Sequence, residues 1–270
     1  MSVSSYLTNL ASTLVLSELE KTSIAVSTTT LSSRLDNYFG SKIIQHFRFG
    51  SSDRGTILPR KADKNSDIDY MVVFNTFNNP MMPQTYLDYL RSFVTSRYAT
   101  SEVKQSYPII ILSLNHINFE LVPSIYNHNY GYSIPSPASH WNDWMNTNPS
   151  ETNKLITNSN KANDFQIKPL VRLIKYWNTS KGSPFTSFSL EKHIVNSSFY
   201  GCSKLSDYFY TFWLGFNYSY NSSQRTQDIV SAAKEHAKTA KIHEDKNMPI
   251  YAEYEIKKKM GMCASATKYA

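Results

Sequence analysis

Apolar residues near the N-terminus recur at the spacing of an amphipathic helix and predict a helix from residue 3 to about residue 19. The repeating positions are Val3, Leu7, Leu10 and Leu14. A second helical stretch follows, and its apolar positions are Leu31, Leu35, Tyr38 and Phe39. The polar, β-branched cluster from Ser27 to Thr30 predicts a break between the two helices.

A β-hairpin is predicted in the middle of the chain. Residues 108–114 are nearly all apolar and residues 117–123 alternate between apolar and polar, with Asn115-His116 at the turn. Alternation places Glu120 on the polar face of the second strand, opposite the apolar residues. Such a strand is able to lie beside another strand that carries acidic residues.

Further helical patterns cover residues 85–97, 165–178, 226–241 and 251–260. The region between residues 126 and 161 is rich in Asn, Ser, Pro and Tyr, so it predicts the crossover between two lobes. Helices therefore dominate the C-terminal half, whereas strands and helices mix in the N-terminal half.

The stretch from Phe49 to Phe74 carries the most distinctive chemistry. Gly50 permits a tight turn, and Ser51 offers hydroxyl and amide donors to a phosphate. Asp67 and Asp69 open an apolar strand, where residues i and i+2 face the same way with Cα atoms roughly 6.5 Å apart. Two such carboxylates can reach a pair of metal ions, and Mg²⁺ suits oxygen ligands. The ordinary explanation of a lone Asp-x-Asp is a solvated strand end.

In the order GS, RGT and SDID, followed by an apolar strand, this stretch resembles the nucleotidyltransferase superfamily with a polymerase-β-like palm. It is most similar to the branch that contains bacterial cyclic-oligonucleotide synthases, cyclic GMP-AMP synthase and the oligoadenylate synthases. The resemblance implies an α/β (α+β) fold. Residues 1–150 would form a mixed-sheet palm with N-terminal helices, and residues 151–270 a helical nucleotide-binding lobe.

The same resemblance assigns metal-binding and catalytic roles. It implies that Asp67, Asp69 and Glu120 hold Mg²⁺ or Mn²⁺, although many relatives carry aspartate where this chain has Glu120. Glu120 or Asp69 is the candidate general base, and geometry must choose between them. From spacing alone, Glu120 is equally well explained as a solvated side chain on an open strand face.

The sequences LVRLIKYW and SFSLEK resemble the helix pair that holds the donor triphosphate in these synthases. The resemblance implies that Lys175 contacts the phosphates, that Ser187 hydrogen-bonds them, and that Phe188 stacks on the donor base. Each residue also has an ordinary explanation. Lys175 continues a basic stripe with Lys168 and Arg172 that would face solvent, and Phe188 would be a core residue.

Composition narrows the classes of protein to which this chain can belong. The chain has 270 residues, of which 41% are hydrophobic and 18% charged, and no apolar run approaches the roughly 20 residues of a membrane span. Cys202 and Cys263 form no CxxC motif, so we expect reduced thiols in a cytoplasmic protein. The net charge of +7 suits nucleoside triphosphates or another polyanion, without a basic tail that would indicate a nucleic-acid activator.

The sequence thus predicts a metal-dependent enzyme that transfers nucleotides from nucleoside triphosphates and releases pyrophosphate. By resemblance, its product is a cyclic or short linear oligonucleotide messenger in anti-phage signalling, with effector or regulatory proteins of a defence operon as partners. Two alternatives stay open. One is a nucleotidyltransferase with an RNA, protein or small-molecule acceptor, and the other is a palm that binds nucleotide or RNA without turnover.

Overall fold

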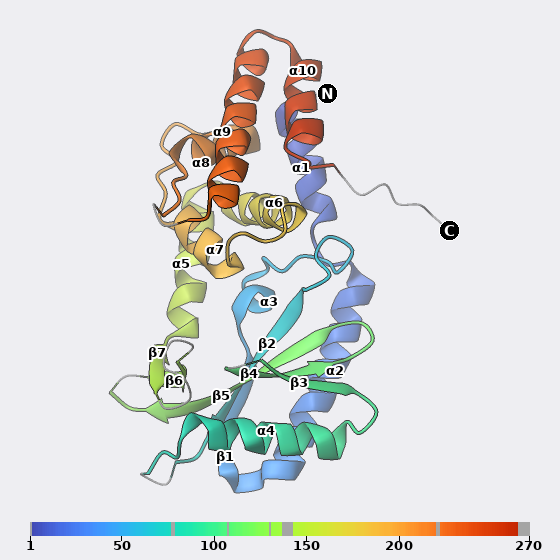
Figure 1. Ribbon diagram of the computed structural model, residues 1–270, viewed down its shortest axis with the longest axis vertical. Helices are drawn as coiled ribbons and strands as arrows, with labels where there is room; N and C mark the ends of the chain where they lie inside the picture. Colours follow the sequence, from blue (N-terminus) through green and yellow to red (C-terminus); the bar gives the residue numbers. More distant parts are fainter. Residues whose placement is uncertain are drawn as a thin grey trace. The chain divides into compact units, whose positions relative to one another are not determined.

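The computed structural model describes residues 2–76, 79–106, 108–129, 131–136, 143–219 and 222–263 (Figure 1). The chain forms two compact units. The helical unit contains residues 1–15, 58–64 and 154–270, and the sheet unit contains residues 16–57 and 65–153. The first helix therefore groups with the C-terminal helices, although the sequence analysis placed it with residues 1–150. That these units are independent domains stays a prediction.

The sheet unit is built on one mixed sheet. Its described strands are β1 (Ile43–Arg48), β2 (Asp67–Phe74), β3 (Glu102–Ser106), β4 (Ile109–Ser113), β5 (Asn118–Asn127), β6 (Gly131–Pro135) and β7 (Trp144–Thr147). The strand order is β1-β2-β5-β4-β3, and β6 pairs with both β5 and β7. Strands β2 and β5 run parallel, whereas the other pairs are antiparallel. The predicted mixed sheet and the predicted hairpin of β4 and β5 are confirmed.

The sheet unit also contains helical elements among its described residues. They are α2 (Glu18–Phe39), the short η1 (Gly40–Lys42), α3 (Gly50–Arg54) and α4 (Pro83–Arg97). Helix α4 packs on β3, β4 and β5, and α2 packs on β1 and α4 (Figure 1). The shared core includes Leu35 of α2, Leu90 of α4 and Phe119 of β5, each fully buried. This packing fixes β2 and β5 on a rigid support.

The predicted helix break at Ser27 to Thr30 was wrong, because α2 continues through it. The hydroxyls of Thr28, Thr29 and Thr30 each donate to the carbonyl oxygen four residues earlier, at 2.7, 3.1 and 3.0 Å. These bonds satisfy the polar side chains within the helix. The interruption lies instead after α1 (Val3–Thr13), where Ser17 and Glu20 form the capping box that starts α2.

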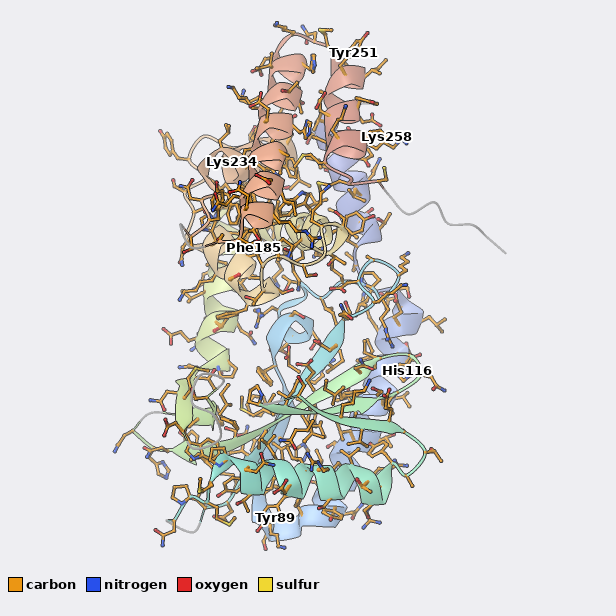
Figure 2. All side chains as sticks on the ribbon, viewed as in Figure 1. Tyr89, His116, Phe185, Lys234, Tyr251 and Lys258 are labelled. Carbon is orange, nitrogen blue, oxygen red and sulfur yellow. The ribbon has the colours of Figure 1, made fainter. Side chains whose placement is uncertain are left out.

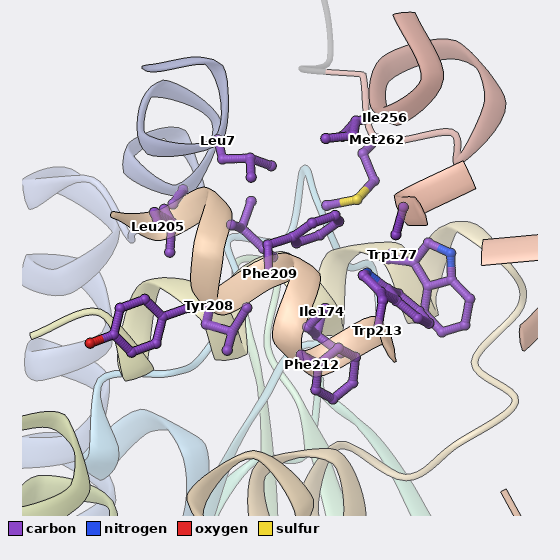
Figure 3. Close-up of a cluster of buried hydrophobic side chains, with 14 of the residues drawn as sticks. Leu7, Ile174, Trp177, Leu205, Tyr208, Phe209, Phe212, Trp213, Ile256 and Met262 are labelled. Carbon is purple, nitrogen blue, oxygen red and sulfur yellow. The ribbon is translucent and has the colours of Figure 1, made fainter. Parts of the chain in front are cut away.

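The helical unit surrounds one apolar core (Figure 3). Its helices are α1, α5 (Pro149–Ala162), α6 (Ile167–Ser180), α7 (Ser187–Val195), α8 (Leu205–Gly215), α9 (Gln224–Asp245), α10 (Pro249–Tyr254) and η2 (Glu255–Lys259). Leu7 of α1 meets the aromatic face of α8, and the indoles of Trp177 and Trp213 cross edge to face with centroids 4.5 Å apart. The core therefore joins chain segments from both termini.

The crossover between the two units predicted for residues 126–161 is confirmed, but the described part of the stretch is built of regular elements. This stretch contains the end of β5, strands β6 and β7, and most of α5, which begins in the sheet unit and continues in the helical unit. Gly131 adopts φ +76° where the chain turns back into β6, and the Asn148 side chain accepts a hydrogen bond from Glu151 N at 3.1 Å as α5 begins. Gly131 and Asn148 therefore lie where regular elements start. Among the described residues, no helix is long and apolar enough to cross a membrane.

Candidate active site

The register of two parallel strands brings the predicted acids together. Asp67 and Asp69 begin β2 with the buried Ile68 between them, so both carboxylates face the same side of the sheet. In the pairing of β2 with β5, Asp69 stands directly opposite Glu120, and Asp67 stands opposite Asn118. The predicted adjacency of the Glu120 strand to the Asp-x-Asp strand is therefore confirmed.

The three acids form a group that is able to hold metal. One carboxylate oxygen from each of Asp67, Asp69 and Glu120 lies within 4.8 Å of the others, and all three side chains are partly buried. Oxygens on opposite sides of one Mg²⁺ lie about 4.2 Å apart, and paired catalytic ions lie about 3.5–4 Å apart. Hard oxygen donors at this separation fit one such ion or a pair that shares ligands.

Electrostatics also favour a cation at this position. Burial raises the pKa of Glu120, the negative charge of Asp69 raises it further, and a hydrogen bond with Asp67 opposes both effects. The carboxylates thus stand close enough to repel one another. A divalent ion between them would remove this repulsion, so the donor set and its charge fit the metal that the sequence predicts.

Gly50 is required by its close approach to Asp69. It begins α3 at φ +70°, and a Cβ at this position would lie 1.8 Å from Asp69 Oδ2. The backbone of the preceding residue is fixed as well, because Phe49 N donates to the Asp69 carbonyl oxygen at 3.1 Å. A side chain at residue 50 would therefore displace a carboxylate of the acidic group.

The short α3 turn holds the predicted phosphate-binding serine. Ser51 is partly buried, and its carbonyl oxygen accepts hydrogen bonds from Thr56 N at 2.9 Å and Ile57 N at 3.1 Å. Gly55 ends the turn in the left-handed conformation, with φ 70°. These contacts order the turn beside β2. The phosphate-binding role of Gly50 and Ser51 stays a prediction.

Lys175 of α6 does not lie on a solvent-facing stripe. Its side chain is only 5% exposed, and its ammonium lies 3.5 Å from Oε1 of Glu191 on α7, itself 4% exposed. The phosphate-binding role predicted for Lys175 stays a prediction, but the structure gives the lysine a buried counter-charge. Sequence analysis missed Glu191. The pattern that could have indicated its burial is a single acidic residue next to the apolar stripe of Leu190 and Ile194.

The other two predicted nucleotide contacts are exposed on the first turn of α7. Thr186 caps the helix by accepting from Ser189 N, and Ser187 is the first helical residue. Phe188 is 53% exposed, so its alternative explanation as a core residue was wrong. An exposed ring beside a capped helix start suits base stacking and anion binding. The assigned roles of Ser187 and Phe188 stay predictions.

Comparison with known proteins gives partial sequence matches. A segment of 111 residues is 26% identical to a probable cyclic nucleotide synthase of Bacillus cereus (strain VD146), covering 38% of this chain and 32% of that protein. A segment of 149 residues is 26% identical to the cyclic AMP-AMP-AMP synthase of an Acinetobacter species, covering 53% of this chain and 42% of that protein. The chain thus matches about a third to two fifths of the length of these curated relatives.

Solved structures share the fold over most of the chain. The di-nucleotide cyclase DncV of Vibrio cholerae, with GTP, has a TM-score of 0.72 at 12% identity and covers 90% of this chain and 91% of that one. CdnC of E. coli MS115-1 has a TM-score of 0.70 with ATP, at 15% identity, and covers 93% and 96%. The complex of CdnC with HORMA-deltaN gives 0.69 at 17% identity and covers 92% and 95%.

A family model describes the part of the chain that carries the acidic group. The model of the Second Messenger Oligonucleotide or Dinucleotide Synthetase domain, SMODS, matches residues 1–160, which include Gly50, both aspartates of β2 and Glu120. This match covers more than half of the 270 residues. The chain therefore belongs to the SMODS family of second-messenger oligonucleotide and dinucleotide synthetase domains.

Proposed function

We propose that this protein is a metal-dependent nucleotidyltransferase that makes a cyclic or short linear oligonucleotide from nucleoside triphosphates and releases pyrophosphate. The observation that carries the proposal is the convergence of Asp67, Asp69 and Glu120 on paired strands within a SMODS domain. Three neighbouring carboxylates repel one another, and bound cations would offset this repulsion.

In this proposal Asp67, Asp69 and Glu120 hold Mg²⁺ or Mn²⁺. When bound, such ions lower the pKa of the attacking ribose hydroxyl and stabilise charge on the transferring phosphoryl group. Gly50 keeps Asp69 in place, because a larger residue would occupy the space of that carboxylate. The general base is Glu120 or Asp69.

The donor nucleotide would be held by the turn at Gly50 and Ser51 and by the helix pair α6 and α7. Lys175 supplies positive charge to the phosphates, Ser187 supplies a hydroxyl and a helix-start amide, and Phe188 stacks on the base. Exposure of Ser187 and Phe188 supports their availability to a ligand. Lys175 would approach the phosphates with the Glu191 carboxylate 3.5 Å from its ammonium.

We further propose that the product acts in anti-phage signalling and that the enzyme works in the cytoplasm. Effector or regulatory proteins of a defence operon would be its partners. The similarity to a CdnC that was solved with HORMA-deltaN supports a protein partner. The similarity to chains solved with ATP and GTP supports nucleoside triphosphates as substrates.

The test is incubation of the purified chain with labelled ATP, GTP, CTP and UTP and with Mg²⁺ or Mn²⁺. Phosphatase-resistant products are then separated, and their masses are measured by mass spectrometry. The same mixtures are run with an Asp67→Asn, Asp69→Asn double variant. Asp88→Asn is the matched control, because it changes an exposed aspartate of α4 outside the acidic group.

A resistant product that is absent from the double variant and present with Asp88→Asn would support oligonucleotide synthesis, and its mass would give the bases and show whether it is cyclised. A product that persists in the double variant would contradict the assigned metal ligands. Label that is transferred only to added RNA, protein or a small molecule would instead favour a different acceptor. Absence of any transfer in every mixture would contradict the proposed activity.

A further inference from the structure

A cavity of about 440 Å³ lies entirely within the helical unit. Its walls come from the segment before α7, from α7 itself, from residues 216–219 after α8, and from residues 222–226 at the start of α9. None of the residues assigned above to metal or triphosphate lines it. Its volume falls in the range of about 300–1,000 Å³ that is usual for small-molecule sites.

Aromatic rings, together with Pro184 and Leu190, form the apolar part of this cavity. The ring of Phe216 lies edge to face with Phe185, with centroids 5.3 Å apart and an interplanar angle of 83°. The imidazole of His193 meets the same Phe216 ring at 4.9 Å and 88°. Surfaces of this kind favour a planar ligand over a branched aliphatic one, because ring faces and edges pack best against other rings.

His193 supplies an unused polar edge. Burial lowers the pKa of His193, so at neutral pH its ring is uncharged and has one hydrogen-bond donor and one acceptor. Neither ring nitrogen has a hydrogen-bond partner within the described part of the chain. The described lining residues include no lysine, arginine, aspartate or glutamate. The cavity therefore matches an uncharged ligand with hydrogen-bonding groups on its edge.

Hydrogen bonds hold two walls in place. Asn178, 3% exposed, donates from Nδ2 to the Phe185 carbonyl oxygen at 2.9 Å and accepts from Phe185 N at 3.1 Å. The Lys234 ammonium donates to the Phe216 carbonyl oxygen at 3.0 Å and to Asn217 Oδ1 at 3.4 Å. Figure 2 labels Phe185 and Lys234. A site whose walls are fixed in advance loses little entropy when it binds a ligand.

We propose that this cavity binds an uncharged heteroaromatic ring of nucleobase size. Phe185 and Phe216 would contact the ring, while His193 would donate to and accept from its polar edge. The first turn of α9, with the Thr226 hydroxyl, offers a second polar wall. This inference goes beyond the proposed function, because binding a ring here requires no nucleotidyl transfer.

The cavity is separate from the surface on which Phe188 is proposed to stack a base. His193 follows Phe188 by five residues, which places the two side chains about 140° apart around α7. Phe188 is absent from the described lining. Two ring sites on different faces of one helix can therefore be distinguished by substitution.

The test is a calorimetric titration of the full chain, without divalent metal, with adenosine, guanosine, cytidine and uridine. We expect at least one nucleoside to bind saturably to the wild type and to the Phe188→Ala variant. His193→Leu keeps apolar packing but removes both nitrogens, so it should weaken binding about tenfold. Ser189→Phe fills the cavity from an exposed position on α7 and should abolish binding.

Ser198→Phe is the matched control, because it adds the same ring at an exposed position outside the cavity and should leave binding unchanged. Thermal unfolding checks that each variant folds, and Asn217→Trp fills the cavity from another wall if Ser189→Phe does not. Absence of saturable binding by all four nucleosides would overturn the proposal. Binding that is lost in Phe188→Ala but kept in both filled variants would overturn it as well. A chain that binds nucleosides here but makes no oligonucleotide would refute only the proposed function.

Discussion

The acidic group of the sheet unit gathers like charges, whereas a buried ion pair of the helical unit joins opposite charges. Asp67, Asp69 and Glu120 converge at the start of two parallel strands, where the charge of Asp69 raises the pKa of Glu120. In the helical unit, Lys175 and Glu191 bury a cation and an anion against each other. The first arrangement gains stability when a cation arrives, and the second is already neutralised. A buried acid can thus signal a ligand site in one unit and a structural pair in the other.

The largest expected effect is a difference in stability between variants of Glu191 and Glu120. Glu191→Gln removes a buried negative charge that lies 3.5 Å from the ammonium of Lys175, so we expect the free energy of unfolding to fall by about 3 kcal/mol. Glu120→Gln removes a charge that Asp69 repels, so without metal it should leave stability equal to or above wild type. Urea unfolding in EDTA measures both changes.

The double variant Lys175→Met, Glu191→Leu is the control for this comparison. It replaces both charges with apolar groups of similar size, and it should recover most of the lost stability. Equal destabilisation by Glu191→Gln and Glu120→Gln would show that the two units do not differ in this way. Loss of nucleotide binding in a stable double variant would further support the phosphate role proposed for Lys175.

A smaller but sharper effect is expected at Gly50. In Gly50→Ala the new Cβ would overlap the Asp69 carboxylate, and the displaced ligand should lower transferase activity about 100-fold. Gly40→Ala is the matched control, because Gly40 also has a positive φ, +51°, but has no atom within 4 Å of the added Cβ. Kinetic assays should show a much larger loss of transferase activity in Gly50→Ala than in Gly40→Ala. Equal losses would attribute the effect to backbone strain alone.

The smallest effect concerns Phe188. Because this side chain is 53% exposed, Phe188→Ala should leave the melting temperature unchanged. Loss of base stacking should raise KM for the donor nucleotide about tenfold. Ile194→Ala on the same helix should lower the melting temperature and leave KM for the donor nucleotide unchanged. Ile194 is fully buried, so its truncation leaves a cavity. A large drop in melting temperature for Phe188→Ala would instead assign this ring to the core.

The acidic group was the most predictable part of the site. Strand alternation alone fixes the shared face of Asp67 and Asp69, and the alternation around Glu120 identified its polar face. The pairing of Asp69 with Glu120 depended on strand order, which local pattern does not encode. Glu191 was missed for a related reason, because its partner lies on another helix. Likewise, the threonines of α2 are helical despite their weak helix propensity. Their hydroxyls donate to carbonyl oxygens within the same helix.

The parallel pairing of β2 with β5 also determines when the acidic group can form. Glu120 follows Asp69 by 51 positions, and α4, β3 and β4 lie between the two strands. Closing this long loop costs chain entropy before any strand contact compensates for it. During synthesis the two aspartates leave the ribosome well before the glutamate does. Affinity for divalent ions should therefore arise late and cooperatively, as a property of the completed sheet.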